Sequence, residues 1–271
     1  MRRLNQITDI QQNLNQILIH FDGICRQYGL RYYLSNGTLL GAVKYGGFIP
    51  WDDDVDVFMP RKDYNRLMEL VETDTERYKL LSCERDARWR LPFAKLTDTH
   101  TVLEEAGADF GIQTGLSIDV FPLDQWGDNH TRAEIRALHC HILKRLLCAS
   151  NAKTFVSPRR GIKRGILWGI WACGHLAGHK YLLKQIQKQS MRVRGQSSYC
   201  GCVVWTAYNT GEVLPSEVFQ DTAYKSFCGG MYPVPCGYET YLTHLYGDYR
   251  RDPPVEKQKS NHDIVAWSIH E

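Results

Sequence analysis

The sequence predicts an α+β protein in which a mixed sheet of short strands is flanked by helices. The early part of the chain repeats apolar residues at helical spacing, and short apolar segments between turns follow it. The middle of the chain then returns to a helical pattern. The 271 residues are 43% hydrophobic, which is enough for one large domain or for a compact domain with an elaborate insert.

The first elements lead into a turn of small residues. Apolar positions over 4–25 predict an amphipathic helix, which Gly29 ends. A strand over 30–34 is expected to run into the turn Ser35–Thr38, and a helix over 39–44 follows it.

Asn36 or Thr38 is expected to cap the helix that follows this turn. The backbone N–H groups at a helix start are unpaired and carry partial positive charge, so they are a natural place for phosphate. Gly37 and Thr38 are therefore candidate phosphate-binding residues. A simple capped turn is the alternative.

Carboxylates recur at alternate positions in the next segment, Phe48–Met59, which is expected to be strand-like. Residues i and i+2 of a strand share a face, so Asp54 and Asp56 would point together. Their neighbours Val55 and Val57 would face the core. Two carboxylates placed in this way suit a hard cation such as Mg²⁺, which in turn can hold phosphate.

A second acidic position lies in an apolar strand expected over 115–124, where Asp119 stands between two apolar neighbours. A buried carboxylate is rare unless it is hydrogen-bonded or ligates a metal. Asp119 is therefore either a structural hydrogen-bonding residue or a third ligand beside Asp54 and Asp56. The other expected elements are a helix over 61–71, strands over 79–81, 92–96 and 101–103, and helices over 131–149 and 239–246.

The charges are unevenly placed along the chain. Between Ile135 and Gly211 there are 13 Lys or Arg residues and no Asp or Glu, so this stretch carries +13. Such segregation is typical of a surface for an anionic partner. Helices that combine Arg and Lys with exposed Trp and Leu can lie in a membrane interface, so 157–194 is a candidate for peripheral membrane contact. A solvated helical insert is the alternative, and the absence of any nucleic-acid-binding motif argues against nucleic acid as the partner.

Several chemistries lack their sequence patterns. The chain has no P-loop, no dinucleotide-binding glycine fingerprint after a strand and no His-Glu-x-x-His motif. A calcium loop beginning at Asp52 would require glycine where Val57 stands.

The cysteine pattern and the chain start predict a reducing, cytoplasmic setting. Nine cysteines include no Cys-x-x-Cys pair, and the start lacks the apolar core of a signal peptide. The stretch Gly165–Leu183 is interrupted by histidines, a lysine and glycines, so it is not expected to span a membrane.

Several motifs, taken together and in order, resemble the LicD family. That family includes bacterial phosphocholine transferases and is related to the fukutin-type ribitol-phosphate transferases. The Trp-Asp-Asp-Asp-x-Asp run is the most specific of these motifs, and the resemblance spans most of the chain. The motifs are Asn36–Val43, Gly47–Val57, Ile118–Asp124, Pro233–Pro235, Tyr246–Tyr249 and Pro253–Pro254.

The resemblance implies a nucleotidyltransferase-like fold, in which a Gly-Ser/Thr turn and an Asp-x-Asp strand hold metal and nucleotide. Gly37 and Thr38 match the turn, with Thr in place of the commoner Ser. Asp54 and Asp56 match the acidic pair, and Asp119 takes the third position. The implied cofactor is Mg²⁺ or Mn²⁺.

The resemblance also implies a reaction. Family members transfer a phospho-substituent, often phosphocholine from CDP-choline, to a sugar hydroxyl of a teichoic acid, lipopolysaccharide or similar glycan such as capsule. For this chain it implies a CDP-linked donor, a lipid-linked glycan acceptor and a cytoplasmic location at the inner face of the membrane. The expected domains are a catalytic domain of residues 1–134 plus 211–271 and a basic helical insert over 135–210.

The implied roles follow from phosphoryl chemistry. Asp54 and Asp56 would hold the metal that binds both phosphates of the donor. Asp119 would complete the coordination shell of the metal and take the proton of the acceptor hydroxyl. Lys95 would neutralise the leaving phosphate, and Asp52 would ligate through water or orient the strand. Further candidates in the tail are Lys257 and His262.

Choline recognition would need aromatic ring faces, because a quaternary ammonium has no N–H to donate. Tyr45 and Trp51 flank the acidic strand and are the expected choline-binding residues. Trp126, Trp205 and Tyr208 are further options.

Two alternatives to a phosphocholine transferase remain at this stage. The same chemistry can use CDP-ribitol, CDP-glycerol or a nucleotide sugar as donor. The chain can also be a non-catalytic nucleotide- or anion-binding module, although such a module has no need of three carboxylates around phosphate.

Overall fold

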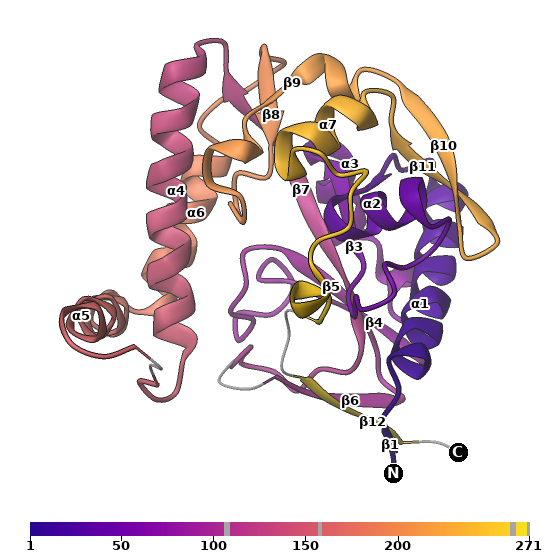
Figure 1. Cartoon of the computed structure of the whole chain (residues 1–271), viewed down its shortest axis with the longest axis horizontal. Coiled ribbons are helices and arrows are strands. Elements are labelled where there is room, and N and C mark those ends of the chain that lie inside the picture. Colours follow the sequence, from indigo (N-terminus) through magenta and orange to yellow (C-terminus); the bar gives the residue numbers. More distant parts are fainter. Residues whose placement is uncertain (106–108, 157–158, 261–263, 270–271) are drawn as a thin grey trace.

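A parallel pair of strands lies at the centre of the protein. The computed structural model describes residues 1–105, 109–156, 159–260 and 264–269 (Figure 1). The strands are β1 (Arg2–Leu4), β2 (Tyr33–Leu34), β3 (Asp56–Pro60), β4 (Tyr78–Leu81), β5 (Ala94–Asp98), β6 (Thr101–Glu105), β7 (Ser117–Gly127), β8 (Tyr199–Gly201), β9 (Leu214–Pro215), β10 (Thr222–Phe227), β11 (Gly230–Pro235) and β12 (Ile264–Ser268). The helices are α1 (Ile7–Tyr28), α2 (Asn36–Lys44), α3 (Arg61–Glu69), α4 (His130–Asn151), α5 (Ile162–Ala177), α6 (His179–Ser190) and α7 (Tyr238–Tyr246), with short 3₁₀ turns η1 (Val71–Thr73), η2 (Asn209–Glu212), η3 (Ser216–Phe219) and η4 (Val255–Lys257).

The central sheet has the strand order β2-β3-β7-β5-β4. β3 and β7 run parallel, whereas the other neighbours in this order are antiparallel. β8 pairs with the end of β7, and β9 pairs with β8. Two smaller sheets, β1-β12-β6 and β10-β11, complete the described strands. The mixed sheet with flanking helices that the sequence predicts is therefore confirmed.

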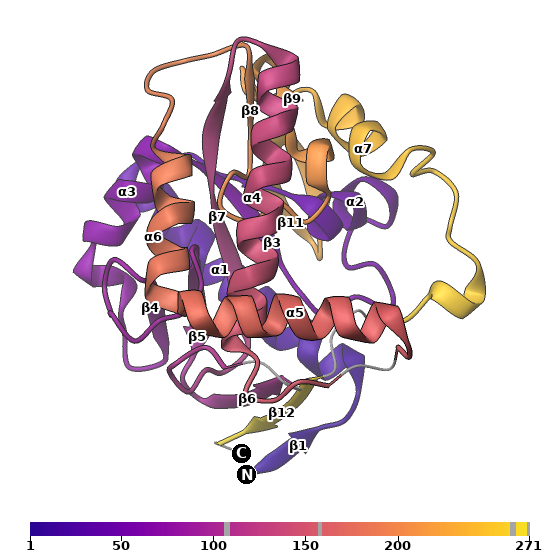
Figure 2. The same ribbon diagram turned by 90° about the vertical axis from the view of Figure 1, so that its left-hand side faces the viewer.

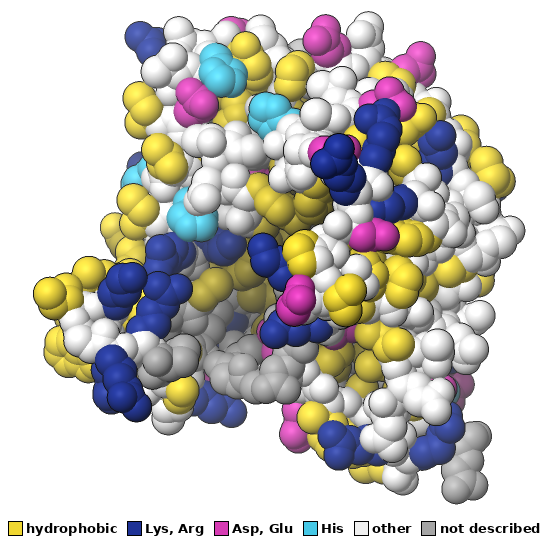
Figure 3. Space-filling view, viewed as in Figure 1, with side chains coloured by type: hydrophobic (Ala, Val, Ile, Leu, Met, Phe, Trp, Pro, Cys, Tyr) yellow, Lys and Arg dark blue, Asp and Glu magenta, His cyan; other side chains and the backbone are white. Residues whose placement is uncertain are grey.

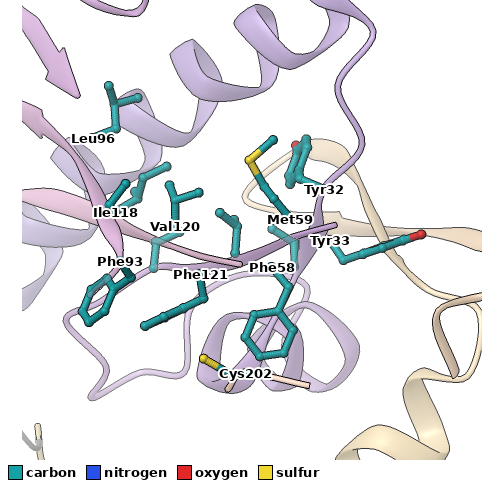
Figure 4. Close-up of a cluster of buried hydrophobic side chains, with 14 of the residues drawn as sticks. Tyr32, Tyr33, Phe58, Met59, Phe93, Leu96, Ile118, Val120, Phe121 and Cys202 are labelled. Carbon is teal, nitrogen blue, oxygen red and sulfur yellow. The ribbon is translucent and has the colours of Figure 1, made fainter. Parts of the chain in front are cut away.

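Alternation along β3 and β7 separates the two faces of the sheet. Ile118 and Val120 of β7 project to the same side as Met59 of β3, whereas Phe58 and Phe121 project to the other side (Figure 4). All five side chains are buried. The sheet is therefore covered on both faces in this region, as parallel pairs usually are.

Helix α1 packs against β5 and β7. Its apolar stripe, which includes Leu14, Ile17 and Leu18, is buried with exposures of 0–1%. Gly29 ends the helix with φ of 60°, a left-handed conformation that glycine adopts without steric strain. The predicted helix and its stop signal are thus confirmed, except that Leu4 belongs to strand β1.

The acidic strand begins later than expected. β3 starts at Asp56, so Asp54 lies in the segment just before it. The amide of Asp119 still donates to the carbonyl of Val55 at 2.8 Å, which continues the parallel ladder beyond the strand. Val55 and Val57 are fully buried, as the alternation predicts.

The segment around Pro233 and Pro235 is a strand, although its prolines predict turns. β11 pairs only with β10 in a two-stranded sheet, with Tyr224 opposite Pro233 and Thr222 opposite Pro235. A strand with one neighbour tolerates proline, because one edge carries no ladder bonds to lose.

The basic middle of the chain forms α4, α5, α6 and β8, and it is largely helical as predicted. Leu143 and Leu147 of α4 and Leu182 and Ile186 of α6 belong to the same buried cluster as the central strands. These helices thus share the core of the sheet, while α5 runs across α4 (Figure 2). The proposed boundaries of an insert stay a prediction.

None of the helices in the described part of the chain has the length and apolar character needed to cross a membrane. The segment 165–183 is divided between α5 and α6. All nine cysteines are free thiols.

One buried ion pair should contribute strongly to stability. The guanidinium of Arg61 donates to both carboxylate oxygens of Asp124 at 2.7 Å, and Asp124 is 2% exposed. Burial raises the pKa of the Asp124 carboxyl, and Arg61 opposes that rise. Because Arg61→Ala leaves this carboxylate buried without its cation, it should lower the free energy of unfolding by about 3–5 kcal/mol in urea titrations.

Arg88→Ala is the matched control, since Arg88 pairs with Asp86 on the surface at 2.7 Å. This control should leave the unfolding midpoint nearly unchanged. Equal effects of the two substitutions would contradict the role given to the buried pair.

Candidate active site

Two acids and a lysine stand in one row across three neighbouring strands. The register of β3 with β7 pairs Asp56 with Asp119, and the register of β5 with β7 pairs Lys95 with Asp119. Residues paired across strands project to the same face of a sheet. The Nζ atom of Lys95 lies 2.5 Å from Oδ1 of Asp119. By alternation, this row shares its face with Phe58 and Phe121.

The acids repel one another at the start of β3. Burial raises the pKa of the Asp56 carboxyl well above its usual range, and the charges of Asp54 and Asp119 raise it further. Asp52 adds a smaller contribution in the same direction. The amide of Asn36 donates to Oδ2 of Asp56 at 3.1 Å and partly offsets these effects. The site therefore concentrates negative charge that a cation would relieve.

Lys95 supplies positive charge on the opposite side of Asp119. Burial is the largest single influence and lowers the pKa of the Lys95 amine, but the charge and hydrogen bond of Asp119, together with the charges of Glu105 and Asp56, outweigh it. The pKa is therefore raised, and the amine stays protonated at neutral pH.

The start of α2 is joined directly to the acidic strand. The backbone N–H of Asp56 donates to Oγ1 of Thr38 at 2.9 Å. Asn36 adopts the left-handed conformation, with φ of 47°, and the hydroxyl of Tyr241 donates to its Oδ1 at 2.8 Å. The N-cap position of α2 is Ser35, so the prediction that Asn36 or Thr38 caps a helix starting at residue 39 was wrong. These two side chains instead hold Asp56.

Gly37 allows a carboxylate to approach the first turn of α2. A Cβ atom at this position would lie 2.6 Å from Oδ2 of Asp52 and 3.9 Å from Oδ1 of Asp54. Any larger residue would therefore displace Asp52. The structure thus brings Gly37 and Thr38 against the acidic segment.

A pair of tyrosines borders the acids. The hydroxyl of Tyr208 donates to that of Tyr246 at 2.9 Å, and their rings meet edge to face at 5.4 Å. Burial raises the pKa of Tyr208 to about 12, and the nearby charges of Asp56 and Asp54 contribute to the rise. Sequence reasoning named Tyr208 only as a further option and missed Tyr246, because nothing in a single sequence reports that α7 reaches the acids.

A buried glutamate fixes the loop that carries Tyr208. Glu212 is 1% exposed, and its Oε1 accepts from the backbone N–H groups of Ala207 at 3.2 Å and Tyr208 at 3.3 Å. Burial raises the pKa of Glu212 to about 7. The indole of Trp126 donates to the backbone carbonyl of Glu212 at 2.7 Å, so Trp126 is a buried structural residue.

Other predicted residues lie elsewhere in the structure. Tyr45 follows α2, and its hydroxyl is hydrogen-bonded to Asp252 in the C-terminal segment. Trp51 lies half-buried in the turn before the acidic segment, and Lys257 is exposed in η4. His262 lies outside the described residues.

The surface of the molecule has a hollow between α4 and the part that carries α2 and α7 (Figure 3). Lys and Arg side chains gather along the α4 edge of this hollow. Positive charge beside a cavity favours anionic ligands.

The carboxylates suit a magnesium ion that also binds substrate. Within the described ranges, no group of three or more His, Cys, Asp or Glu side chains is placed to hold a metal ion. Mg²⁺ is usually bound by one or two carboxylates, and water and substrate phosphates supply its other ligands. The mutual repulsion of Asp54, Asp56 and Asp119 fits such a site, because a cation would relieve it.

Comparisons with known proteins identify the family of this chain. Residues 29–142 match the family model described as LicD/FKTN/FKRP, nucleotidyltransferase domain. The lipopolysaccharide cholinephosphotransferase LicD of Haemophilus influenzae is 30% identical over 258 residues, which cover 93% of this chain and 94% of that protein. The chain is a phosphotransferase enzyme. It belongs to the LicD family, as the motif resemblance predicted.

Two further relatives match shorter stretches. Human ribitol 5-phosphate transferase FKRP is 42% identical over 48 residues, 18% of this chain and 10% of that protein. Mannosyltransferase regulator 4 of Saccharomyces cerevisiae is 27% identical over 124 residues, 43% of this chain and 10% of that protein.

The repulsion around Asp56 predicts a stability gain on neutralising it. The folded-state pKa of Asp56 is raised, so its charge costs stability once the pH exceeds the unfolded-state value. Asp56→Asn should therefore raise the melting temperature at neutral pH and low salt by roughly 2–4 °C. The difference from the wild type should shrink as the pH falls, because Asp56 is then protonated.

Thermal scans from acid to neutral pH provide this measurement. Glu72→Gln, on the exposed turn η1, is a control that should show no such pH dependence. A lower melting temperature of Asp56→Asn at neutral pH would contradict the repulsion.

Proposed function

We propose that the enzyme is a metal-dependent transferase that moves phosphocholine from CDP-choline to a hydroxyl of a cell-surface glycan precursor and releases CMP. The observation that carries this proposal is the row of Asp56, Asp119 and Lys95, with Asp54 beside it. The nearly full-length similarity to a protein named as a lipopolysaccharide cholinephosphotransferase supports the donor and the class of acceptor.

Asp54 and Asp56 would hold the metal, with Asp119 as the third acid and Asp52 placed to act through water. When bound there, Mg²⁺ or Mn²⁺ would neutralise charge on the two phosphates of the donor. The first turn of α2, at Gly37 and Thr38, adds the partial positive charge of a helix start.

The acceptor hydroxyl attacks the phosphorus that carries choline, and the bond from that phosphorus to the bridging oxygen breaks. The proton of the hydroxyl passes to the carboxylate of Asp119. Neutralising Asp119 weakens its hold on Lys95, which lies 2.5 Å away. The Lys95 cation is then available to pair with the phosphate of departing CMP.

The choline group would rest on aromatic rings near the acids. Tyr208 and Tyr246 are suitable rings, because they pack together and the charge of Asp56 acts on both of their hydroxyls. Tyr45 and Trp51, the residues predicted from sequence, form the alternative cage. The acceptor would be lipid-linked, and the reaction would take place on the cytoplasmic side of the membrane.

CDP-ribitol is the second candidate donor. The observation that favours it is the 42% identity over 48 residues to a protein named as a ribitol 5-phosphate transferase. CDP-glycerol and nucleotide sugars are further donors of the same kind. A non-catalytic anion-binding module would not require the acidic row.

A donor panel tests the proposal. Purified enzyme is incubated with CDP-choline, CDP-ribitol, CDP-glycerol and GDP-linked sugars, each with Mg²⁺, Mn²⁺ or a chelator. Mass spectrometry then identifies the released nucleotide and the transferred group. CMP release from CDP-choline that needs the metal is expected, and metal-independent release or exclusive use of another donor would contradict the proposal.

The carboxylates should be essential for turnover. Asp54→Asn and Asp119→Asn should each lower the rate of CMP release by roughly 10²–10³-fold, since each removes charge aimed at the reacting phosphates. Glu72→Gln is the matched exposed control and should keep the wild-type rate. Near-normal turnover by a folded Asp54→Asn enzyme would contradict the assignment.

The tyrosine pair should set the affinity for choline. Because a desolvated cation–π contact is worth up to about 2 kcal/mol, Tyr208→Leu should raise KM for CDP-choline about tenfold. Tyr208→Phe keeps the ring and should change KM little. If Tyr45→Leu raised KM and Tyr208→Leu did not, the cage would lie at the residues predicted from sequence.

A further inference from the structure

One side of helix α5 is exposed. Gly174 is its one buried residue. A Cβ atom at Gly174 would lie 2.5 Å from the carbonyl oxygen of Leu146 and 3.2 Å from Cβ of Ala149, both on α4. The helix is therefore held against α4 through this glycine, and it runs across α4 at the surface (Figure 2).

The exposed side of α5 is apolar. Ile162, Trp168 and Leu176 are 86%, 56% and 88% exposed. At 100° per residue they lie on the side opposite Gly174, and Ile166, which is 59% exposed, flanks them. From Gly165 to Gly178 the sequence has no Asp, Glu, Lys or Arg. Contiguous apolar surface of this kind usually marks a contact site.

We propose that α5 lies in the interface of an anionic lipid bilayer. Its 16 residues are fewer than the about 20 needed to cross the hydrocarbon core, so the helix would lie along the surface with its apolar side inserted. The ring of Trp168 suits this position at the membrane surface, because tryptophan prefers the boundary between headgroups and hydrocarbon.

The positive charge around α5 favours anionic lipid over a second copy of the chain as its contact partner. Lys163 and Arg164 are exposed in the first turn of α5, and the surrounding stretch from Ile135 to Gly211 carries +13. In the space-filling view, Lys and Arg side chains lie beside hydrophobic ones on the arm that α5 forms (Figure 3). A second copy of the chain would bring the same positive charge against this one, whereas anionic headgroups complement it. This inference does not depend on which donor the enzyme uses.

Vesicle flotation with the full chain tests the proposal. Vesicles of phosphatidylcholine alone are compared with vesicles that also contain phosphatidylglycerol. Wild-type protein should float with the anionic vesicles, bind the neutral ones roughly tenfold less, and be released by salt. Addition of anionic vesicles should shift tryptophan fluorescence to shorter wavelength, and Trp168→Phe should reduce that shift while binding persists.

Matched variants test the apolar and the basic side chains of this surface separately. The double variant Trp168→Ser, Leu176→Ser should lower binding to anionic vesicles about tenfold or more, as should Lys163→Glu, Arg164→Glu. Ile19→Ser on α1, which replaces a side chain 48% exposed, and Lys62→Glu on α3 should leave binding unchanged. Circular dichroism confirms that each variant is folded.

Three results would overturn the proposal. The first is wild-type protein that ignores anionic vesicles. The second is undiminished binding by the Trp168→Ser, Leu176→Ser variant. The third is a wild-type dimer in sedimentation that this variant loses, which would assign the apolar side to a second copy.

Discussion

The parallel pairing of β3 with β7 is the constraint on which the site depends. Its register places Asp56 directly beside Asp119, so two carboxylates of like charge share one face of the sheet. This arrangement opposes folding, as the raised pKa of Asp56 indicates. It persists because buried residues of the same strands, such as Val57 and Val120, fix the register from the other face.

The surrounding elements compensate for this concentrated charge. Lys95 enters from β5 on the far side of Asp119, and Asn36 enters from α2 on the near side of Asp56. Tyr241 holds Asn36 in a left-handed conformation that asparagine tolerates better than most residues. The C-terminal helix α7 thereby stabilises a site whose acids come from the first half of the chain. Stability given up at such a site is a common feature of enzymes.

The sequence predicted the buried positions beside the candidate acids but not the neighbours of those acids. Alternating Asp and Val residues predicted which side chains would be buried, and the isolated Asp119 in an apolar strand predicted a partner for Asp56. The alignment of these two strands depends on pairing between distant segments, which periodicity does not encode. The ion pair of Lys95 with Asp119 follows from the same register, so the sequence did not predict it.

Other features escaped prediction for similar reasons. α2 begins at Asn36, three residues earlier than predicted, because local propensity treats Ser35–Thr38 as a turn. Tyr246 and Glu212 reach the site through contacts of the last third of the chain with α2 and α4, and no local pattern predicts these contacts. The two prolines of β11 are compatible with a strand because β11 has a single neighbour, and that pairing is not encoded locally in the sequence. For α5 the sequence left a membrane-facing helix and a solvated insert as alternatives, and the structure supplied the exposure of Trp168 and Leu176.

We propose that Asp54 and Asp56, with Asp119 beside them, bind a divalent cation jointly with the phosphates of a CDP-linked donor. Electron paramagnetic resonance of Mn²⁺ measures this directly, because free and bound Mn²⁺ differ in their spectra. Titration of wild-type enzyme should show Mn²⁺ binding that tightens when CDP-choline is added, and Asp56→Asn should abolish that tightening. Equal Mn²⁺ binding by both proteins, with no effect of the nucleotide, would contradict the account.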